Sequence, residues 1–211
     1  DIVGFSAAQI ISLTTTQAAA LSTQQALALS VTLIAAFETA DAQVLSTSTL
    51  STLTSAQIGS FGTDAIAALS TQQISDGVGT DIVGLSTAQF AALSTASVAA
   101  FTTQQLVAGV GSGSLGLGTA QIAALKTDAI AALTTSQVQV FTTNQLVALS
   151  TSQLAALSTA QATKLTSAQV SALSDKQLTS MTTSNLAVLT TDGIAALSSA
   201  QVRGLTSDQI K

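Results

Sequence analysis

Apolar and polar residues follow each other along this chain with a period of eight. From Phe5 to Leu205 every eighth residue is Leu, Phe or Met, except at Gly77 and Gly109, and no insertion interrupts the register. A second apolar residue, usually Ile, Val, Leu or Phe, follows five residues after the first. The stretch from Leu85 to Ala92, LSTAQFAA, shows the complete unit. We call this unit the octad and number its positions one to eight from the Leu.

The polar residues of the octad carry signals for a helix start. Position two is mostly Ser or Thr and position five is mostly Gln, which is the spacing of a capping box. The apolar residues at positions one and six are correctly placed for a hydrophobic staple around that cap. Examples are Ser86 with Gln89, Thr102 with Gln105, Thr134 with Gln137, and Ser150 with Gln153. The pattern therefore predicts a new helix in every octad.

Two other conformations fit the pattern less well. In a strand, positions one and six would point to opposite faces, because side chains alternate with period two. In one continuous helix, the apolar stripe would turn by roughly 80° per octad and spiral over every face. We therefore predict an all-α solenoid of very short helices, one per octapeptide, each about six residues and roughly 9 Å long. A β-solenoid is the alternative fold.

Charged residues support this assignment independently of the apolar pattern. Acidic residues favour helix N-termini and basic residues favour C-termini, because of the helix dipole. The predicted helices place Asp175 at N1, Asp64, Asp128, Asp192 and Asp208 at N2, Asp41 and Asp81 at N3, and Lys164, Arg203 and Lys211 in last turns. Lys126, at a cap, and Lys176, at N2, do not follow the trend.

Composition narrows the classes of function. Only 7% of the 211 residues are charged, the net charge is −5, and the chain has no Pro, Cys, His, Trp or Tyr. The acidic net charge leaves no basic surface of the kind that nucleic-acid binding requires, and the chain has no Trp or Tyr to stack on bases. No apolar run approaches the length of a membrane-spanning helix, so we expect no transmembrane segment.

The residues that carry most enzyme chemistry are absent. Without His or Cys there is no imidazole base, no thiol nucleophile and no common transition-metal site. The acidic residues occur singly, far apart along the array, and the Gly-rich stretch GVGSGSLG lacks the Lys of a phosphate-binding loop. We therefore expect no enzyme activity, no catalytic residues and no bound cofactor.

We expect one continuous repeat array over residues 1–211, with Gly-rich altered repeats at 76–84 and 109–118. Their spacing is a multiple of eight, so they are altered octads and not inserted linkers. Glycine destabilises helices by up to about 1 kcal/mol per residue, so non-helical geometry or close backbone packing is expected there. The array begins and ends within an octad and has no atypical terminal repeat, although solenoids usually carry such caps. This favours a segment of a longer protein.

One Gly-rich stretch contains candidate metal ligands. Residues 77–83, GVGTDIV, resemble part of the calcium-binding nonapeptide of RTX proteins, in which carboxylate and carbonyl oxygens of stacked copies bind Ca²⁺. The chain has one copy, Asp76 replaces the first Gly, and the second Gly-rich stretch lacks the Asp. We interpret the stretch as a structural turn, with Asp76 and Asp81 as weak calcium candidates.

The tandem pattern L-[ST]-T-x-Q-[IVL]-A-A resembles the repeat regions of very large secreted or surface proteins of Gram-negative bacteria. The resemblance is clearest over residues 85–108 and 117–205. Such proteins often also carry RTX-type segments and leave the cell through type I secretion. The resemblance implies adhesins, biofilm matrix or surface-layer material, at an extracellular or cell-surface location. It supplies no catalytic or binding residues.

Two hypotheses for function follow. The first is a structural or adhesive extracellular protein, an extended rod or filament whose partner is a further copy of itself, because octads must stack to bury their apolar residues. The second is a binding module that presents a hydroxyl-rich face to a glycan, to ice or to a partner protein. We prefer the first, because the capping interpretation occupies the Ser and Thr hydroxyls with backbone N–H groups.

Overall fold

The computed structural model describes residues 2–109 and 116–211, which divide into two compact units. The described part of unit 1 is residues 2–109 with 116–117, and that of unit 2 is residues 118–211. Every regular element in these residues is a helix, and none is a strand. The predicted all-α solenoid of short helices is therefore confirmed. The prediction of one continuous array through residues 110–115 concerns residues outside the described part.

Unit 1 starts with a short 3₁₀ helix, η1, and its α-helices have four to seven residues. Its elements are η1 (Ile2–Gly4), α1 (Ala7–Ile11), α2 (Thr15–Ala19), α3 (Thr23–Leu27), α4 (Val31–Ile34), α5 (Thr39–Val44), α6 (Thr47–Leu50), α7 (Ser55–Ser60), α8 (Thr63–Ala68), η2 (Gln73–Val78), η3 (Gly79–Gly84), α9 (Thr87–Ala92), α10 (Thr95–Ala99) and α11 (Thr103–Gly109). The octad period places one helix in each repeat, as predicted.

Unit 2 repeats the same short helix without irregular elements. Its elements are α12 (Thr119–Ala124), α13 (Thr127–Ala132), α14 (Thr135–Gln139), α15 (Thr143–Val147), α16 (Thr151–Ala155), α17 (Thr159–Ala162), α18 (Ser167–Ala172), α19 (Asp175–Ser180), α20 (Thr183–Ala187), α21 (Thr191–Ala195), α22 (Ser199–Gly204) and α23 (Ser207–Ile210).

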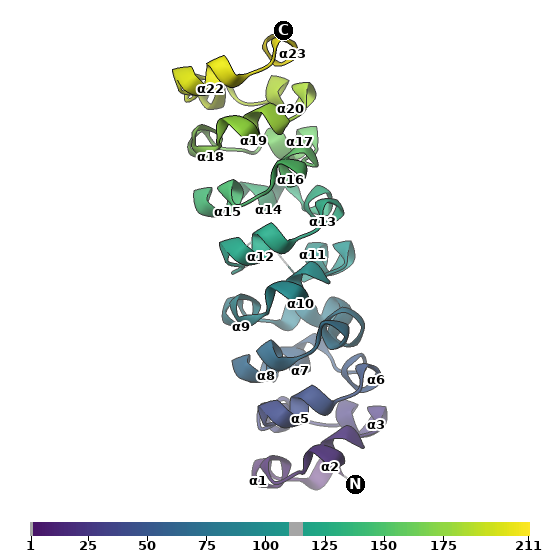
Figure 1. Ribbon diagram of the computed structural model, residues 1–211. Helices are drawn as coiled ribbons and strands as arrows, with labels where there is room; N and C mark the ends of the chain where they lie inside the picture. Colours follow the sequence, from purple (N-terminus) through teal and green to yellow (C-terminus); the bar gives the residue numbers. More distant parts are fainter. Residues whose placement is uncertain (1, 110–115) are drawn as a thin grey trace. The chain divides into compact units, whose positions relative to one another are not determined.

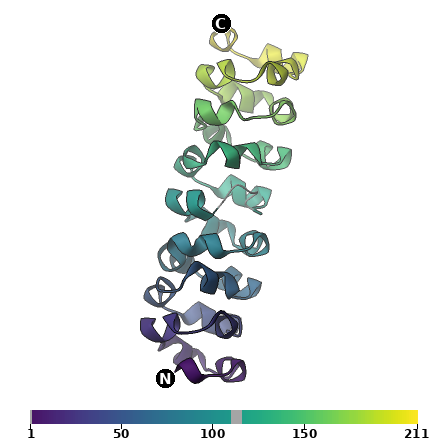
Figure 2. The same cartoon turned by 180° about the vertical axis from the view of Figure 1, so that it is seen from behind.

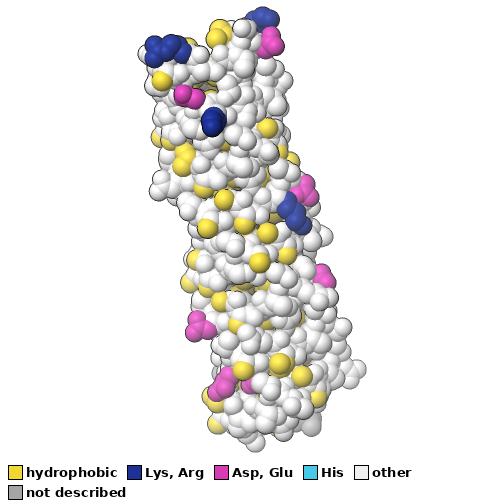
Figure 3. Space-filling model, in the orientation of Figure 1, with side chains coloured by type: hydrophobic (Ala, Val, Ile, Leu, Met, Phe, Trp, Pro, Cys, Tyr) yellow, Lys and Arg dark blue, Asp and Glu magenta, His cyan; other side chains and the backbone are white. Residues whose placement is uncertain are grey.

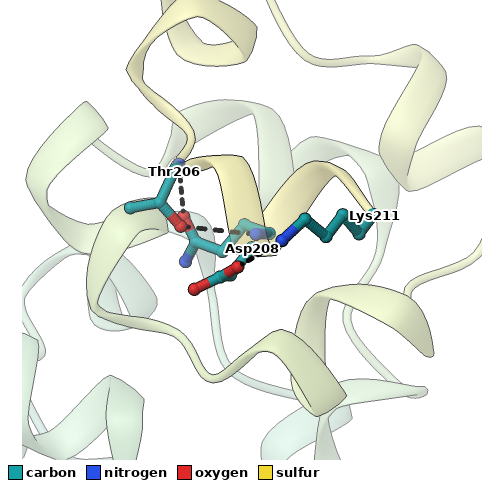
Figure 4. A network of polar contacts seen from close by, with 4 residues as sticks. Thr206, Asp208 and Lys211 are labelled. Atoms are coloured by element: carbon teal, nitrogen blue, oxygen red, sulfur yellow. Dashed lines mark hydrogen bonds and ion pairs between the residues drawn. The ribbon is translucent and has the colours of Figure 1, made fainter.

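Most helices begin with the predicted capping box. At α9, the Gln89 N–H donates to Ser86 Oγ at 3.3 Å, and the Ser86 N–H donates to Gln89 Oε1 at 2.7 Å. Figure 4 shows the equivalent contacts around Thr206, beside an exposed ion pair between Asp208 and Lys211 with an N···O distance of 2.9 Å. A cap of this kind stabilises a helix by about 1 kcal/mol, whereas an exposed ion pair contributes little.

Three octads complete one coil of the solenoid. Each helix packs on the helix that lies three octads further along the chain, as in the series α2, α5, α8 and α9 of unit 1. The series α14, α17, α20 and α23 follows the same rule in unit 2. Figures 1 and 2 show this stacking of short helices within each unit, seen from opposite sides. The octad spacing alone does not predict this number, because it depends on how helices far apart in the sequence stack.

The core of each unit consists of octad positions one and six. At α7, Ile58 is fully buried and Phe61 nearly so, and the same two positions are buried in most octads. The rings of Phe37 and Phe61, which are three octads apart, meet edge to face with centroids 6.1 Å apart. Each such side chain contributes about 1.5–3 kcal/mol on burial. Within residues 2–109 and 116–211, no helix has the length and apolar character needed to cross a lipid bilayer.

Two sequence-based expectations need correction. Non-helical geometry was expected at residues 76–84, but this stretch completes the π-helix η2 and forms the 3₁₀ helix η3. Stacking on α6 and α7 keeps it helical despite its glycines. Lys164 and Lys211 were expected in last turns, but α17 ends at Ala162 and α23 ends at Ile210, so both lysines lie beyond their helices. The second Gly-rich stretch, 109–118, falls largely on residues outside the described part.

Candidate functional site

The most distinctive chemical feature of both units is a set of buried amides. They belong to octad position five, which we call the ladder position and which recurs at every eighth residue from Gln9 to Gln209. Sequence reasoning assigned this Gln to the cap alone, with no reason to bury it. In the structure Gln153 is only 3% exposed, and most ladder glutamines beyond the first coil are similarly buried.

Most buried ladder glutamines bond in two directions. Gln153 Oε1 accepts a hydrogen bond from the Ser150 N–H at 2.7 Å, which closes its own capping box. Its Nε2 donates to three carbonyl oxygens of the preceding coil, those of Leu125 at 2.6 Å and of Ile122 and Ala123 at 3.3 Å. These carbonyls lie at the C-terminal end of α12, where the last carbonyls of a helix have no partner four residues on. Ile122 O also accepts from the Leu125 N–H at 3.2 Å. One side chain therefore caps a helix start and ties it to a helix end one coil away.

The same geometry recurs at fixed sequence distances. In unit 1, Gln57 Nε2 donates to Leu29 O at 2.8 Å, and Gln73 Nε2 donates to Leu45 O at 2.8 Å. Both acceptors lie 28 residues before the donor, as Leu125 does for Gln153. A buried amide of this kind fixes the position of one coil on the next, because a shift that leaves a buried partner without its hydrogen bond costs about 1–3 kcal/mol for each unsatisfied group.

Shorter polar residues at the ladder position preserve part of this contact. Thr49 Oγ1 donates to Leu21 O at 3.2 Å, and Asn185 Nδ2 donates to Leu157 O at 2.7 Å, again 28 residues earlier. Leu33, Ala65, Ala129 and Gly193 have no side-chain donor at this position. Asp41 is also a ladder residue and is 2% exposed. Burial raises the pKa of its carboxyl group, and the nearby Glu38 carboxylate raises this pKa further.

The two calcium candidates have separate hydrogen-bond partners. Asp81 Oδ1 accepts from the Ser55 hydroxyl at 2.7 Å, a contact between η3 and α7, while Asp76 Oδ1 accepts from the adjacent Ser75 hydroxyl at 2.8 Å. Among the described residues, no three His, Cys, Asp or Glu side chains lie close enough to hold one metal ion. Calcium binding at Asp76 and Asp81 stays a prediction.

Glycines in this region allow backbone to touch backbone. A Cβ at Gly84 would lie 1.8 Å from Ser55 O, and one at Gly59 would lie 2.1 Å from Gly84 O. Gly79 adopts φ +54°, a left-handed conformation that favours glycine, and its carbonyl oxygen accepts from Gln105 Nε2 at 3.2 Å. The expected close backbone packing is therefore confirmed, and the glycines serve the contact between α7 and η3.

Two groups of Ser and Thr residues recur with the octad. Hydroxyls at the cap, such as Ser86 Oγ, accept from backbone N–H groups, as predicted. The first helical position carries a second row of hydroxyls, which in unit 1 includes Thr15, Thr39, Thr63 and Thr87 on the stacked helices α2, α5, α8 and α9. These four threonines are exposed. Figure 3 shows that charged side chains are sparse on the visible face.

One cleft in unit 1 marks an interruption of the ladder. It has a volume of about 540 Å³ and lies between the first turns of α5 and α8, lined by residues 37–40 and 62–65. Both helices start without a capping side-chain bond, at Glu38 and Gly62, and Ala65 occupies the ladder position of α8. The cleft therefore lies where two caps and one ladder side chain are missing.

Comparison with known proteins identifies the repeat. A family model described as the ALTTAQ repeat matches residues 34–74, 116–143, 140–175 and 179–211, which together exceed half of the chain. No curated protein matches the chain, and no solved structure matches it. The matched residues include many of the caps and ladder glutamines described above, among them Gln57, Gln73 and Gln153. The chain therefore belongs to the ALTTAQ repeat family.

Proposed function

We propose that the chain is a structural and adhesive repeat protein that works outside the cell as an extended rod or filament. Its setting would be the cell surface, a biofilm matrix or a surface layer. The observation that carries the proposal is the ladder, since successive coils offer side-chain donors to the coil before them and carbonyl acceptors to the coil after them. An interface of this kind can be repeated any number of times.

The same interface supports the chain itself as its own partner. In the first coil the ladder residues are less covered than in later coils, with Gln9 and Gln17 exposed and Gln25 half-buried. Any further coil that offers C-terminal helix carbonyls could accept from their Nε2 groups, whether it comes from a longer chain or from a second copy. A heterologous contact of this kind extends into an open fibre when it does not close into a ring.

The proposal includes an extracellular location and gives the chain neither an enzymatic role nor a cofactor. The lack of His and Cys and the wide spacing of the acidic residues support the proposal that the chain has no enzymatic role and no cofactor. Resemblance to the repeat regions of large Gram-negative surface proteins supports the extracellular location and suggests cell-surface glycans as additional partners. It also suggests secretion by the type I route.

Electron microscopy of the purified chain over a range of concentrations tests the filament. We expect rods that lengthen end to end as the concentration increases. A variant with Gln9→Glu, Gln17→Glu and Gln25→Glu keeps the cap acceptors but replaces the outward donors with carboxylates, so it should remain short. Dispersed monomers of the unaltered chain at high concentration would contradict the filament.

The exposed threonine row supports a second candidate, a hydroxyl-rich binding face. Thr15, Thr39, Thr63 and Thr87 recur once per coil on stacked helices, so they form a regular row. A glycan array and an ice-recrystallisation assay would detect the two ligand classes. Activity that saturates, disappears when the four residues are changed to Val, and persists when they are changed to Ser would favour this function. Equal activity of the Val and Ser variants would count against it.

A further inference from the structure

Asp41 combines burial with an unmet hydrogen-bonding requirement. It lies at N3 of α5, as its place in the octad predicts, but only 2% of its surface is exposed. Among the buried side-chain nitrogen and oxygen atoms that the structure describes, Asp41 Oδ2 is the one without a hydrogen-bond partner. A buried polar atom without a partner destabilises the folded chain, unless a change of protonation state gives it a partner.

The ladder position defines which partner is missing. Side chains of three lengths there, Gln73, Thr49 and Asn185, all donate to the carbonyl oxygen 28 residues earlier, at 2.8, 3.2 and 2.7 Å. For Asp41 the equivalent acceptor is the carbonyl oxygen of Leu13, which follows α1. A carboxylate has no hydrogen to donate to it, whereas a neutral carboxyl group has one O–H donor and keeps one acceptor oxygen.

The titratable groups on the elements around Asp41 are all acidic, and Glu38 is the one whose charge raises the Asp41 pKa. On its own helix, Asp41 has Glu38 at the N-cap, and the packed helix α8 contributes Asp64. The packed helix α2 and residues 10–13 contain no titratable group, and the chain has no Lys or Arg before Lys126. Burial raises the pKa of the Asp41 carboxyl group above its ordinary value of 3.8, and the Glu38 carboxylate raises it further.

We propose that Asp41 makes the contact between the first two coils of unit 1 depend on protonation. The neutral acid donates from Oδ2 to the Leu13 carbonyl and replaces the missing glutamine. Ionisation removes this hydrogen and places a negative charge against helix-end carbonyl oxygens, so α5 separates more easily from the coil that contains α1 and α2. Acid therefore tightens this contact and neutral pH loosens it.

The sign of the pH dependence follows from proton linkage. The folded chain holds the Asp41 proton more tightly than the unfolded chain does, so stability falls as pH rises. The contribution is fully present below the ordinary pKa and is lost as pH rises through the raised folded value. Between the two values, the opening equilibrium should increase by up to about tenfold per pH unit.

Hydrogen exchange of the whole chain, resolved by mass spectrometry, tests the proposal. The Asp41→Asn variant supplies a permanent Nδ2 donor, as Asn185 does at its own ladder position. We expect peptides covering residues 13–45 to exchange faster in the unaltered chain than in this variant, by a ratio that increases with pH. Peptides of unit 2 should exchange at the same rate in the unaltered chain and in the variant at every pH. Asp64→Asn, which changes an exposed carboxylate on the next coil, should leave residues 13–45 unchanged relative to the unaltered chain.

Two results would overturn the proposal. One is equal exchange of residues 13–45 in the unaltered chain and in Asp41→Asn at every pH. The other comes from a ¹³C NMR titration of the Asp41 carboxyl carbon in the unaltered chain, which does not depend on any variant folding. A titration midpoint at or below the ordinary aspartate value would exclude a neutral Asp41 in the folded chain, whereas a raised midpoint would support it.

Discussion

Unit 1 and unit 2 follow the same octad but differ in how their coils recognise one another. In unit 2 the ladder is nearly uniform, with Gln153, Gln161, Gln169 and Gln177 each donating to the carbonyl 28 residues earlier. In unit 1 the same position holds residues of several kinds. Beyond the first coil its non-glutamine ladder residues are Leu33, Asp41, Thr49, Ala65, Asp81 and Ser97.

This difference affects the register in which successive coils pair more than it affects the fold. Uniform coils fit one another equally well after a shift of one octad, because every ladder amide meets an equivalent carbonyl. Unit 1 contains pairs that fit only each other, such as Gly59 with Gly84, Gly77 with the Leu50 side chain, and Ser55 with Asp81. We infer that irregular residues fix the register in unit 1, while unit 2 tolerates changes in repeat number.

Deletion of one octad should produce the largest difference in behaviour between the two units. Removal of residues 150–157 joins Leu149 to Ser158 and gives every later ladder residue an equivalent acceptor, so unit 2 should keep its helical circular dichroism and its cooperative urea transition. Removal of residues 62–69 places Ser51 where Gly59 now meets Gly84. Since no Cβ fits there, unit 1 should lose its protection from hydrogen exchange.

A deletion of half an octad, residues 154–157, provides the control, because it breaks the octad register and should disrupt unit 2. Comparable loss of structure after the full-octad and half-octad deletions in unit 2 would show that its register is fixed after all. Retention of exchange protection in unit 1 after removal of residues 62–69 would show that the glycine contacts do not fix its register.

Glycine at octad position eight gives a matched pair of substitutions. Gly84→Ala introduces a Cβ 1.8 Å from Ser55 O, so the backbones of α7 and η3 must move apart. We expect a loss of about 3 kcal/mol or more in the free energy of unfolding. Gly204→Ala places its Cβ 3.4 Å from Asp175 Cβ, an ordinary contact, and alanine favours the helix by up to about 1 kcal/mol.

Urea unfolding of the two variants, followed by circular dichroism, measures this contrast. The expected result is a lower midpoint for Gly84→Ala and an unchanged or slightly higher midpoint for Gly204→Ala. Equal midpoints would mean that the α7–η3 contact relaxes without cost, and the glycines would then have no role in fixing the register.

The parts of this fold that could be predicted from the sequence are those determined within one octad. A cap hydroxyl, a Gln three residues later and the staple around them act over a few residues, so helix starts such as Ser86 and Thr134 were predictable. The number of octads per coil was not, because it depends on how distant helices stack. For the same reason the glycines at 76–84 were wrongly expected to break the helix, since their neighbours lie on α6 and α7.

The burial of the ladder glutamines could have been recognised from one unused signal. A capping box accepts Glu as readily as Gln, yet the only Glu in the chain is Glu38, which is not at a ladder position. Glu matches the acceptor oxygen of Gln but lacks its N–H donors. The exclusion of Glu therefore indicates that the amide nitrogen is needed, and hence that a second set of acceptors lies nearby.

Changing ladder glutamine to glutamate tests this interpretation directly. Gln153→Glu keeps the bond to the Ser150 N–H but replaces the donor to three carbonyls with a buried negative charge, so we expect a loss of about 2–4 kcal/mol. Gln17→Glu makes the same change in the first coil, where the side chain is exposed and Oε1 accepts from the Thr14 N–H at 2.9 Å. That variant should stay within about 0.5 kcal/mol of the unaltered chain.

The pair is compared by urea unfolding at pH 7. Because both substitutions change the net charge equally, a difference between them isolates the burial of the amide. Equal losses in the two variants would assign the effect to the cap, and the carbonyls of the preceding coil would then contribute nothing measurable.

The smallest expected effect is a gain at Gly193, the ladder glycine within residues 118–211 of unit 2. Gly193 lies three octads after Gln169, in the stacked pair α18 and α21, and a Cβ there would lie 3.2 Å from Thr190 Oγ1 and 3.5 Å from Val170 Cγ2. Gly193→Gln would supply an acceptor for the Thr190 N–H and donors for the Leu165 carbonyl, and would remove a helical glycine. We expect a stabilisation of about 1–2 kcal/mol.

Gly193→Ala separates the two sources of this gain. Alanine removes the flexibility of glycine and adds no hydrogen bond, so the difference between the urea midpoints of the Gln and Ala variants measures the ladder contact itself. A Gln variant no more stable than the Ala variant would mean that the amide does not reach the Leu165 carbonyl. If the Gln variant is more stable than the Ala variant, a single residue can restore a missing ladder contact. The ladder of unit 2 would then be still more uniform than that of unit 1.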